Sequence, residues 1–112
     1  SISKRGGVAI EAGMVLSNEP GYYRTDHYGI RLENLVVACH ASDPGFLCFE
    51  TLTLCPFDRR LIRPELLSPI ERQWVDDYHQ RVRAELTPFL PTTCQTWLAA
   101  ACKPLEVTVK TR

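Results

Sequence analysis

The spacing of apolar residues changes once along the chain, from strand-like before residue 54 to helical after Ser68. Residues 8–54 hold short apolar or alternating runs separated by glycine, proline and aspartate, which is typical of antiparallel strands joined by turns. After Ser68 the apolar residues recur every four positions, as on one face of a helix. This order predicts an α+β fold, and 112 residues are enough for one domain with a terminal tail.

Four strands are expected in the first half of the chain, over residues 8–10, 14–19, 29–38 and 46–54. The third is expected to be irregular at Glu33–Asn34. The polar and aromatic segment 22–28 is predicted to be a loop. Because both faces of the fourth strand carry apolar residues, we expect it to be covered on each side.

The clearest local signal is a helix start at Ser68. The stretch Ser68-Pro69-Ile70-Glu71 combines an N-cap serine, a proline at the first helical position and a glutamate placed for a capping box. The apolar stripe of this helix consists of Ile70, Trp74, Tyr78, Val82 and Leu86. We expect the stripe to pack in the core, on the sheet, rather than to bind a partner.

Prolines at positions 88 and 91 are expected to end this helix. Residues 92–95 are then predicted to cap a shorter helix over Thr96–Cys102. Trp97, Leu98 and residues 99–101 are expected to dock this helix against the rest of the domain. Residues 106–112 carry little apolar content and are expected to form a mobile tail.

Charge and cysteine content argue against several function classes. Lys plus Arg and Asp plus Glu both count 13, so no net field would attract nucleic acid or an anionic membrane. No apolar run approaches the ~18 residues of a membrane span. Five cysteines without a CxxC spacing favour neither a disulfide framework nor a structural zinc site. Cys39, Cys48 and Cys55 lie among apolar residues, so we expect buried, reduced thiols and a cytoplasmic protein.

Two acidic residues, Glu19 and Glu33, stand within otherwise apolar, strand-like runs. If the two strands are neighbours, these side chains converge on one point. A buried carboxylate needs a proton, a cation or a metal ion to offset its charge. One interpretation is a salt bridge to Arg31, two residues from Glu33. The other is a divalent metal site with oxygen ligands, which an arginine and a tyrosine hold in place from behind.

The residues around these acids resemble a known family. The runs EAGMVL (11–16), NEPGYY (18–23) and YGIRLEN (28–34) are similar to the closing part of the active site of Xaa-Pro aminopeptidases, the aminopeptidase P family of pita-bread metallopeptidases. The runs TLTLCP (51–56), LSP (67–69) and WVDDYH (74–79) are similar to the C-terminal section of the long eukaryotic cytosolic form. The likeness extends from about Glu11 to Leu105, and the first residue is not methionine, so we expect a segment of a longer protein.

The resemblance implies a fold, a reaction and a set of site residues. The chain would be the C-terminal half of a pita-bread domain, with residues 1–90 in the catalytic domain and 91–112 as an extension. Glu19 and Glu33 would be two of five ligands to two divalent cations, usually manganese. Glu33 would bridge the metals, and Glu19 would also take the proton of the attacking water. Arg31 and Tyr23 would orient these carboxylates, and the substrate would be a peptide with proline in second position.

The family's other three ligands, two aspartates and a histidine, lie upstream of this region and have no counterpart here. The resemblance therefore implies that the upstream half of the domain is a partner, that the parent is a homodimer, and that the isolated chain binds little metal and is inactive. We expect His27 to be a solvated loop residue or to lie on the substrate side of the site. His40 and His79 are expected to be surface or packing residues, and Arg59, Arg60 and Arg63 a solvated basic cluster.

Two other interpretations remain open. A prolidase-like dipeptidase would share the metal ligands and differ in the residues that hold the substrate. A non-catalytic pita-bread module that binds proteins or peptides would have no need of Glu19, Arg31 and Glu33, although ligands outside this chain could still have been lost.

Overall fold

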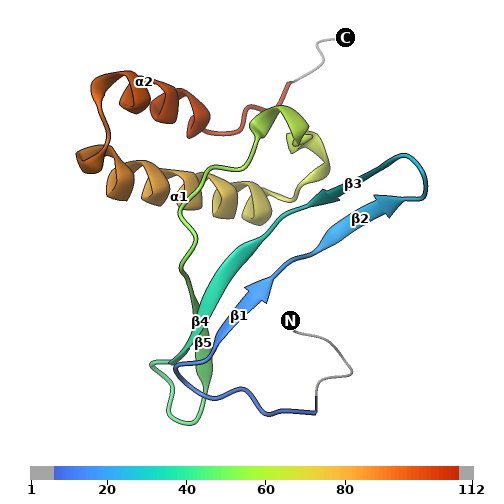
Figure 1. Ribbon diagram of the computed structural model, residues 1–112, viewed down its shortest axis with the longest axis vertical. Helices are drawn as coiled ribbons and strands as arrows, with labels where there is room; N and C mark the ends of the chain where they lie inside the picture. The colour runs from blue at the N-terminus through green and yellow to red at the C-terminus, as the bar shows by residue number, and fades with distance from the viewer. Residues whose placement is uncertain (1–6, 109–112) are drawn as a thin grey trace. The chain divides into compact units, whose positions relative to one another are not determined.

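The chain divides into two compact units, one up to Thr53 and one from Leu54 onward. They are seen in a computed structural model (Figure 1), which describes residues 7–108. Within the described residues, the regular structure of the first unit is all strand and that of the second is all helix. This agrees with the predicted α+β class and with the predicted change of pattern before Ser68.

The first unit is built from two antiparallel ladders. β1 (Val15–Asn18) and β5 (Leu47–Thr51) pair with opposite edges of β4 (Asn34–His40). β2 (Gly21–Arg24) and β3 (Tyr28–Arg31) form a separate hairpin. The predicted strands 14–19 and 46–54 are thus confirmed in their central parts.

The two ladders share one register. Asn18 faces Asn34 at the end of the first, and Gly21 faces Arg31 at the start of the second, so each strand advances by three residues between them. Leu32 N–H donates to Pro20 O at 3.0 Å, but Pro20 has no N–H to return a bond. The ladder is therefore interrupted at this point without a change of register.

Two strand predictions were wrong. Residues 22–28 were expected to be a loop, but the pairing of β2 with β3 leaves only a short turn at residues 25–27. Asp26 adopts φ 58° there, a left-handed conformation that Asp tolerates better than most residues. Residues 8–10 are not a strand; Gly13 N–H still donates to Ala38 O, and the pairing with β4 ends there. The irregularity expected at Glu33–Asn34 lies one residue earlier, at residues 32–33, which form the gap between β3 and β4.

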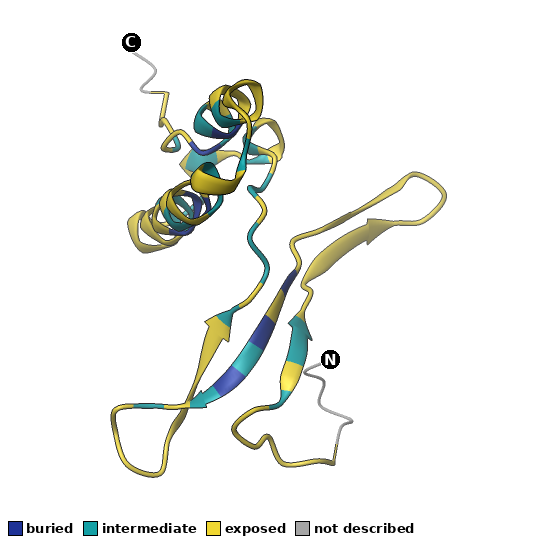
Figure 2. Cartoon of the chain, turned by 60° about the vertical axis from the view of Figure 1, so that its left-hand side comes forward, coloured by how far each residue is buried: buried dark blue, intermediate teal, exposed yellow. Residues whose placement is uncertain are grey.

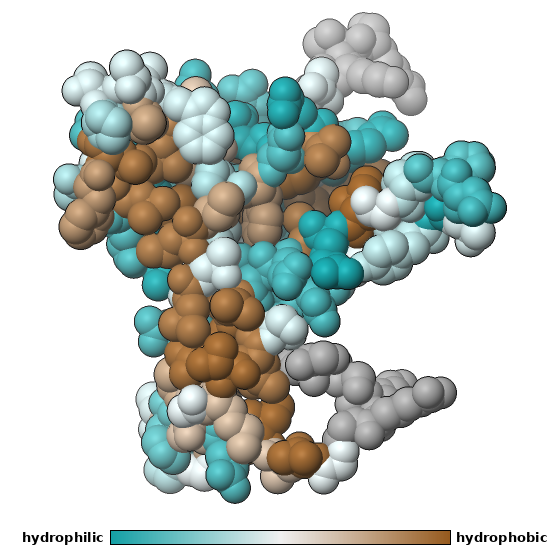
Figure 3. Space-filling view, viewed as in Figure 1, coloured by the Kyte–Doolittle hydropathy of each residue, from teal (hydrophilic) through white to brown (hydrophobic). Residues whose placement is uncertain are grey.

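The fourth strand was predicted to be covered on both faces, and this prediction was wrong. Most of β5 is exposed (Figure 2), and Figure 3 shows apolar residues at the surface over the sheet. The large exposed side chains there include Leu35, Phe46, Leu47, Phe49 and Leu52. All five cysteines are free, but Cys48 and Cys55 are exposed and Cys39 is half-buried, so the burial expected for them was wrong. Alternation predicts which residues share a face, whereas burial depends on what covers that face.

The second unit starts its long helix as predicted. α1 (Pro69–Leu86) has Ser68 as its N-cap, and both hydrogen bonds of the capping box to Glu71 are present. α2 (Thr92–Ala101) begins four residues earlier than the predicted Thr96, because residues 92–95 form its first turn instead of a cap. Short 3-10 turns precede and follow α1: η1 (Arg59–Leu61), η2 (Pro64–Leu66) and η3 (Thr87–Phe89). No helix within residues 7–108 has the length and hydropathy to cross a membrane.

The core of the second unit lies between α1 and α2. Tyr78 and Val82 from α1 pack with Leu98 and Cys102, and Leu54, Phe57, Leu86 and Leu90 surround them. The predicted stripe is thus buried only in part, since Ile70 is 83% and Trp74 51% exposed. Of the residues expected to dock α2, Leu98 is buried in this core, whereas Trp97 is 63% exposed and does not dock the helix.

The three arginines after the sheet differ in their surroundings. Arg60 and Arg63 are exposed and form ion pairs with Asp58 at 2.7 Å and Glu65 at 2.8 Å, in keeping with a solvated cluster. Arg59 is half-buried and donates to Ala100 O at 3.2 Å and to Pro104 O at 3.0 Å. Arg59 therefore links the end of α2 to the segment before α1. It is not the solvated side chain that was expected at this position.

His79 is a packing residue, as expected, and it is fully buried. Its Nε2 accepts a hydrogen bond from Phe57 N–H at 2.9 Å, so the ring is neutral with its proton on Nδ1. Burial lowers the pKa of His79; the nearby Arg59 lowers it further, and Asp76 raises it. His40 lies at the exposed end of β4. Residues 106–108 have no helix or strand, and the rest of the expected tail, 109–112, lies outside the described residues.

Leu98→Ala should lower the free energy of unfolding by about 2–5 kcal/mol, because it leaves a cavity in a fully buried position. Ile70→Ala is the matched control: its side chain is of similar size but 83% exposed, so the change should stay within about 0.5 kcal/mol. Urea unfolding followed by circular dichroism measures both. Equal losses in the two variants would contradict this account of the core.

The second unit should lose stability in mild acid. A proton on Nε2 of His79 removes the acceptor for Phe57 N–H, so the unfolded chain binds the proton more readily than the folded chain. Stability therefore falls once the pH drops below 6.5, the ordinary pKa of histidine, and continues to fall until the lowered folded pKa is reached. The slope is at most about 1.4 kcal/mol per pH unit.

Unfolding at pH 7 and pH 5.5 tests this dependence. His79→Gln should flatten the slope, whereas His40→Gln should leave it unchanged. Asp58 does not interfere, because its hydrogen bonds with Arg60 lower its pKa to about 2. A slope that survives His79→Gln would show that another group is responsible.

Candidate metal centre

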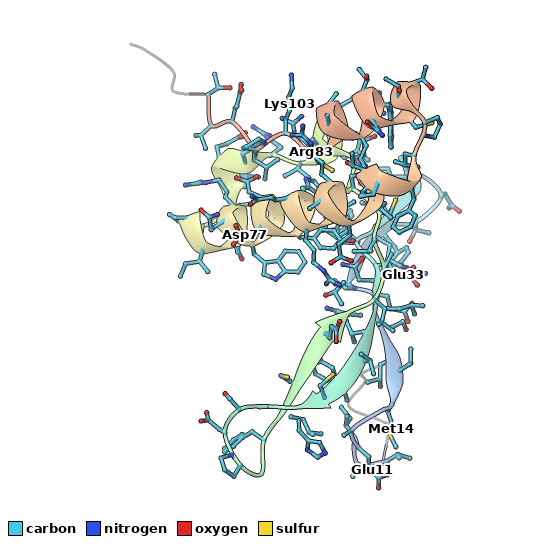
Figure 4. The ribbon with its side chains drawn as sticks, turned by 90° about the vertical axis from the view of Figure 1, so that its left-hand side faces the viewer. Glu11, Met14, Glu33, Asp77, Arg83 and Lys103 are labelled. Atoms are coloured by element: carbon cyan, nitrogen blue, oxygen red, sulfur yellow. The ribbon has the colours of Figure 1, made fainter. Side chains whose placement is uncertain are left out.

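Glu19 and Glu33 face each other across the interruption between the two ladders. Glu19 directly follows β1 and Glu33 directly precedes β4, where Figure 4 labels it. Because the register continues from Asn18–Asn34 to Gly21–Arg31, these two residues are directly opposite. Side chains that face each other in an antiparallel pair lie on the same side of the sheet. The two acids were expected within adjacent strands, but in the structure both lie just beyond the ends of strands.

Both carboxylates reach one cation. Arg31 Nη1 lies 3.7 Å from Glu19 Oε2 and 3.5 Å from Glu33 Oε2. The convergence expected from the sequence is therefore present, but the expected burial is not. The side chains of Glu19, Glu33 and Arg31 are 38%, 46% and 47% exposed. Water screens these ion pairs, so their value lies more in placing the carboxylates than in stability.

Tyr23 fixes the position of Arg31 from the other side. Arg31 Nε donates to Tyr23 Oη at 2.9 Å, and the Arg31 Cζ atom lies 6.0 Å from the centre of the tyrosine ring. The hydrogen bond to Tyr23 is the main cause that raises the pKa of Arg31, and the two glutamates add to it. The resemblance implied that Arg31 and Tyr23 together orient the carboxylates, and in the structure these two side chains are in contact.

Two glycines make room for the tyrosine ring. A Cβ atom at Gly29 would lie 2.7 Å from Tyr23 Cδ1, and one at Gly21 would lie 2.9 Å from Tyr23 Oη. Gly29 faces Tyr23 and Gly21 faces Arg31 across the β2–β3 hairpin, so the ring lies against both glycines. This role was not predicted from the sequence. The signal was the alternation Gly21-x-Tyr23 and Gly29-x-Arg31, which puts all four residues on one face.

His27 lies in the turn of the β2–β3 hairpin, exposed to solvent. Its Nδ1 is 2.8 Å from Thr25 O. Six residues separate it from Glu33, about 20 Å along an extended strand. The hairpin therefore holds His27 at the opposite end from the carboxylates, and its role on the substrate side stays a prediction.

The chemistry of these donors fits part of a metal site. Carboxylate oxygens suit hard divalent cations such as magnesium and manganese, which take about six ligands. Glu19 and Glu33 already bring two such groups to one positive charge. Among residues 7–108, however, no group of three or more His, Cys, Asp or Glu side chains could hold a metal ion. The residues present can thus supply ligands to a centre that needs others.

Two family models match the chain on either side of this site. Residues 1–39, which include both glutamates, match the metallopeptidase family M24, and residues 45–105 match the C-terminal region of peptidase M24. The chain belongs to the M24 metallopeptidase family.

Similar proteins agree with this assignment. A "Probable Xaa-Pro aminopeptidase P" of Coprinopsis cinerea is 41% identical over 87% of this chain, and one of Arthroderma benhamiae is 44% identical over 88%. The chain spans only 17% and 15% of the length of these two relatives.

A solved structure shares the fold. The chain superposes with a TM-score of 0.80 on X-prolyl aminopeptidase from Caenorhabditis elegans, described as a cytosolic enzyme with a di-nuclear active site. The two are 36% identical, and the match covers 91% of this chain and 18% of that enzyme. The predicted pita-bread fold and the predicted family are thereby confirmed.

Gly29→Ala should displace the Tyr23 ring and break its hydrogen bond with Arg31, because the new methyl group occupies the place of the ring. The Arg31 Nε–H signal in a nitrogen–proton NMR spectrum should then move to the position found in Tyr23→Phe. Gly7→Ala is the control, since nothing lies within 4 Å of a Cβ atom there. If Gly29→Ala leaves the Arg31 signal unmoved, the glycine is not needed to place the tyrosine.

Proposed function

We propose that this chain is the closing segment of the catalytic domain of a dinuclear Xaa-Pro aminopeptidase and that it supplies Glu19 and Glu33 to the metals. The observation that carries the proposal is the convergence of the two carboxylates on Arg31 across a break in one ladder. Relatives named Xaa-Pro aminopeptidase and a neighbour with a di-nuclear active site support it. The substrate is a peptide with proline in second position, and the reaction releases the residue before it.

The residue types suit peptide hydrolysis by a metal pair. Two divalent cations, when bound, lower the pKa of a shared water and polarise the scissile carbonyl. Glu19 and Glu33 would hold these cations, with Glu33 shared between them, and Glu19 would also accept the proton of the attacking water. We propose manganese, the metal that the family resemblance implies, and carboxylate ligands are compatible with it.

Arg31 and Tyr23 keep the carboxylates in place. Arg31 lies within ion-pair distance of both acids, and Tyr23 Oη accepts from its Nε. A carboxylate that is held from behind loses less freedom when it binds a cation, so these two residues preorganise the site without moving a proton themselves.

The rest of the proposal concerns the whole protein. The three remaining ligands lie in the upstream half of the domain, so this chain alone binds metal weakly and does not hydrolyse peptides. Residues 1–90 belong to the catalytic domain and 91–112 to an extension. The whole protein is a cytoplasmic homodimer. Free thiols and a cytosolic neighbour support the location.

Activity should depend on both glutamates. With the preceding residues of its own protein restored, the chain should hydrolyse Xaa-Pro-Yaa peptides in the presence of manganese. Glu19→Gln and Glu33→Gln should each lower kcat/KM by about 100-fold or more, since a neutral amide is a poor ligand, and Tyr23→Phe by about tenfold. Glu11→Gln, at the other end of β1 (Figure 4), should have no effect.

The same assay distinguishes the alternatives. Cleavage of Xaa-Pro dipeptides but not of longer peptides would favour a prolidase-like enzyme. Metal bound without hydrolysis of either would favour a binding module. If the isolated 112-residue chain binds manganese tightly, as measured by electron paramagnetic resonance, the view that it holds only part of the site is wrong.

A further inference from the structure

Two free cysteines face each other on neighbouring strands of the sheet. Cys39 of β4 is the direct partner of Cys48 of β5 in the antiparallel ladder. Opposite residues in such a pair place their side chains on the same face. Cys48 is exposed and Cys39 is half-buried, so one thiol is open to a solute and the other is within its reach.

The hydrogen bonds of the ladder define how far apart the two residues lie. Ala41 N–H donates to Phe46 O, and Leu52 N–H donates to Leu35 O. Hydrogen-bonded pairs alternate with non-hydrogen-bonded pairs along an antiparallel ladder. Cys39–Cys48 lies two positions from Ala41–Phe46 and is therefore a hydrogen-bonded pair.

This geometry permits a disulfide but strains it. Cα atoms in a hydrogen-bonded pair are about 5.5 Å apart, which lies within the range of disulfides. The Cβ atoms are about 5.5 Å apart, whereas a relaxed disulfide needs about 3.8 Å. The strands must tilt to close the difference. Strained and exposed disulfides are reduced easily, which is the behaviour of reversible ones.

In the reduced chain each thiol contacts a strand carbonyl. Cys39 Sγ lies 3.7 Å from Val37 O, and Cys48 Sγ lies 3.8 Å from His40 O. Both bonds are long and weak, so rotation about χ1 costs little. The other cysteines belong to the second unit. Cys94 lies on α2, and Cys55 lies between Leu54 and Pro56. Cys102 is buried, and its burial raises the pKa of its thiol.

We propose that in this chain, where no other protein surface covers the sheet, Cys39 and Cys48 are a site of reversible oxidation by small disulfides such as oxidised glutathione. The Cys48 thiolate attacks one sulfur of oxidised glutathione, forms a mixed disulfide and releases one glutathione. The Cys39 thiolate then attacks Cys48 Sγ and displaces the second glutathione. Two protein thiols are oxidised, one glutathione disulfide is reduced, and both protons end on glutathione. The product links β4 to β5 across the connection that holds Gly45.

The experiment equilibrates the 112-residue chain with glutathione buffers of rising oxidised fraction, traps free thiols by alkylation and maps disulfides by mass spectrometry. Cleavage at Asp43 and Phe49 separates Cys39, Cys48 and Cys55. We expect Cys39–Cys48 to be the main protein disulfide and to disappear when reduced glutathione is added. Cys39→Ser should stop at the mixed disulfide on Cys48, and Cys55→Ser should change nothing.

A shifted pair tests the strain. His40→Cys with Leu47→Cys, in a chain that also carries Cys39→Ser and Cys48→Ser, creates the neighbouring non-hydrogen-bonded pair, whose Cβ atoms lie closer. Its disulfide should need at least about tenfold more reduced glutathione for half reduction. The proposal would be overturned if Cys48 paired equally with Cys39 and Cys55, or if the same disulfides formed in chain unfolded by urea. It would also be overturned if glutathione bound to the cysteines without a protein disulfide forming, or if the two pairs of cysteines formed equally stable disulfides.

Discussion

The candidate site depends on one backbone constraint, the continuity of register across Pro20. Proline lacks the N–H that would close the pair with Leu32, so the ladder stops, but Leu32 N–H still donates to Pro20 O. This single bond keeps Gly21 opposite Arg31 just as Asn18 is opposite Asn34. A slip of one residue would turn Glu33 to the other face of the sheet. The main chain therefore places the two carboxylates, whether or not anything covers them.

Given that placement, the charge on Arg31 resolves a conflict between folding and binding. Two carboxylates on opposite residues repel each other unless a cation lies near both. Arg31 is that cation here, and the hydrogen bond that it donates to Tyr23 Oη holds it at the edge of the pair. Arg31 lies 3.5–3.7 Å from the two carboxylates, farther than the 2.7 Å between Arg60 and Asp58. At this longer distance it offsets the negative charge of the acids without occupying all of their oxygens. In the proposed enzyme this leaves oxygens free for metal ions.

How much could be predicted from the sequence depends on the range of the interactions involved. The start of α1 was predictable because Ser68, Pro69 and Glu71 satisfy the helix end among themselves. Likewise, spacing and the resemblance were enough to bring Glu19, Glu33, Arg31 and Tyr23 together. The β2–β3 hairpin was missed because its turn depends on a left-handed Asp26 without the usual glycine signal. The roles of Gly21 and Gly29 were missed because they concern space left for another side chain. Burial was the least predictable feature, because a pattern on one strand says nothing about what lies over it.

The two units differ in how they are stabilised, and this difference bears on the site. The helical unit buries Tyr78, Val82 and Leu98 among its own residues and so has a core of its own. The strand unit leaves Phe46, Phe49 and Leu52 exposed and relies on main-chain pairing, although exposed apolar side chains on this scale favour burial against other protein surface. The relatives are several times longer than this chain, which gives such a surface a source. Because register and not burial sets the positions of Glu19 and Glu33, covering the sheet would exclude water and strengthen their interaction with cations without rebuilding the site.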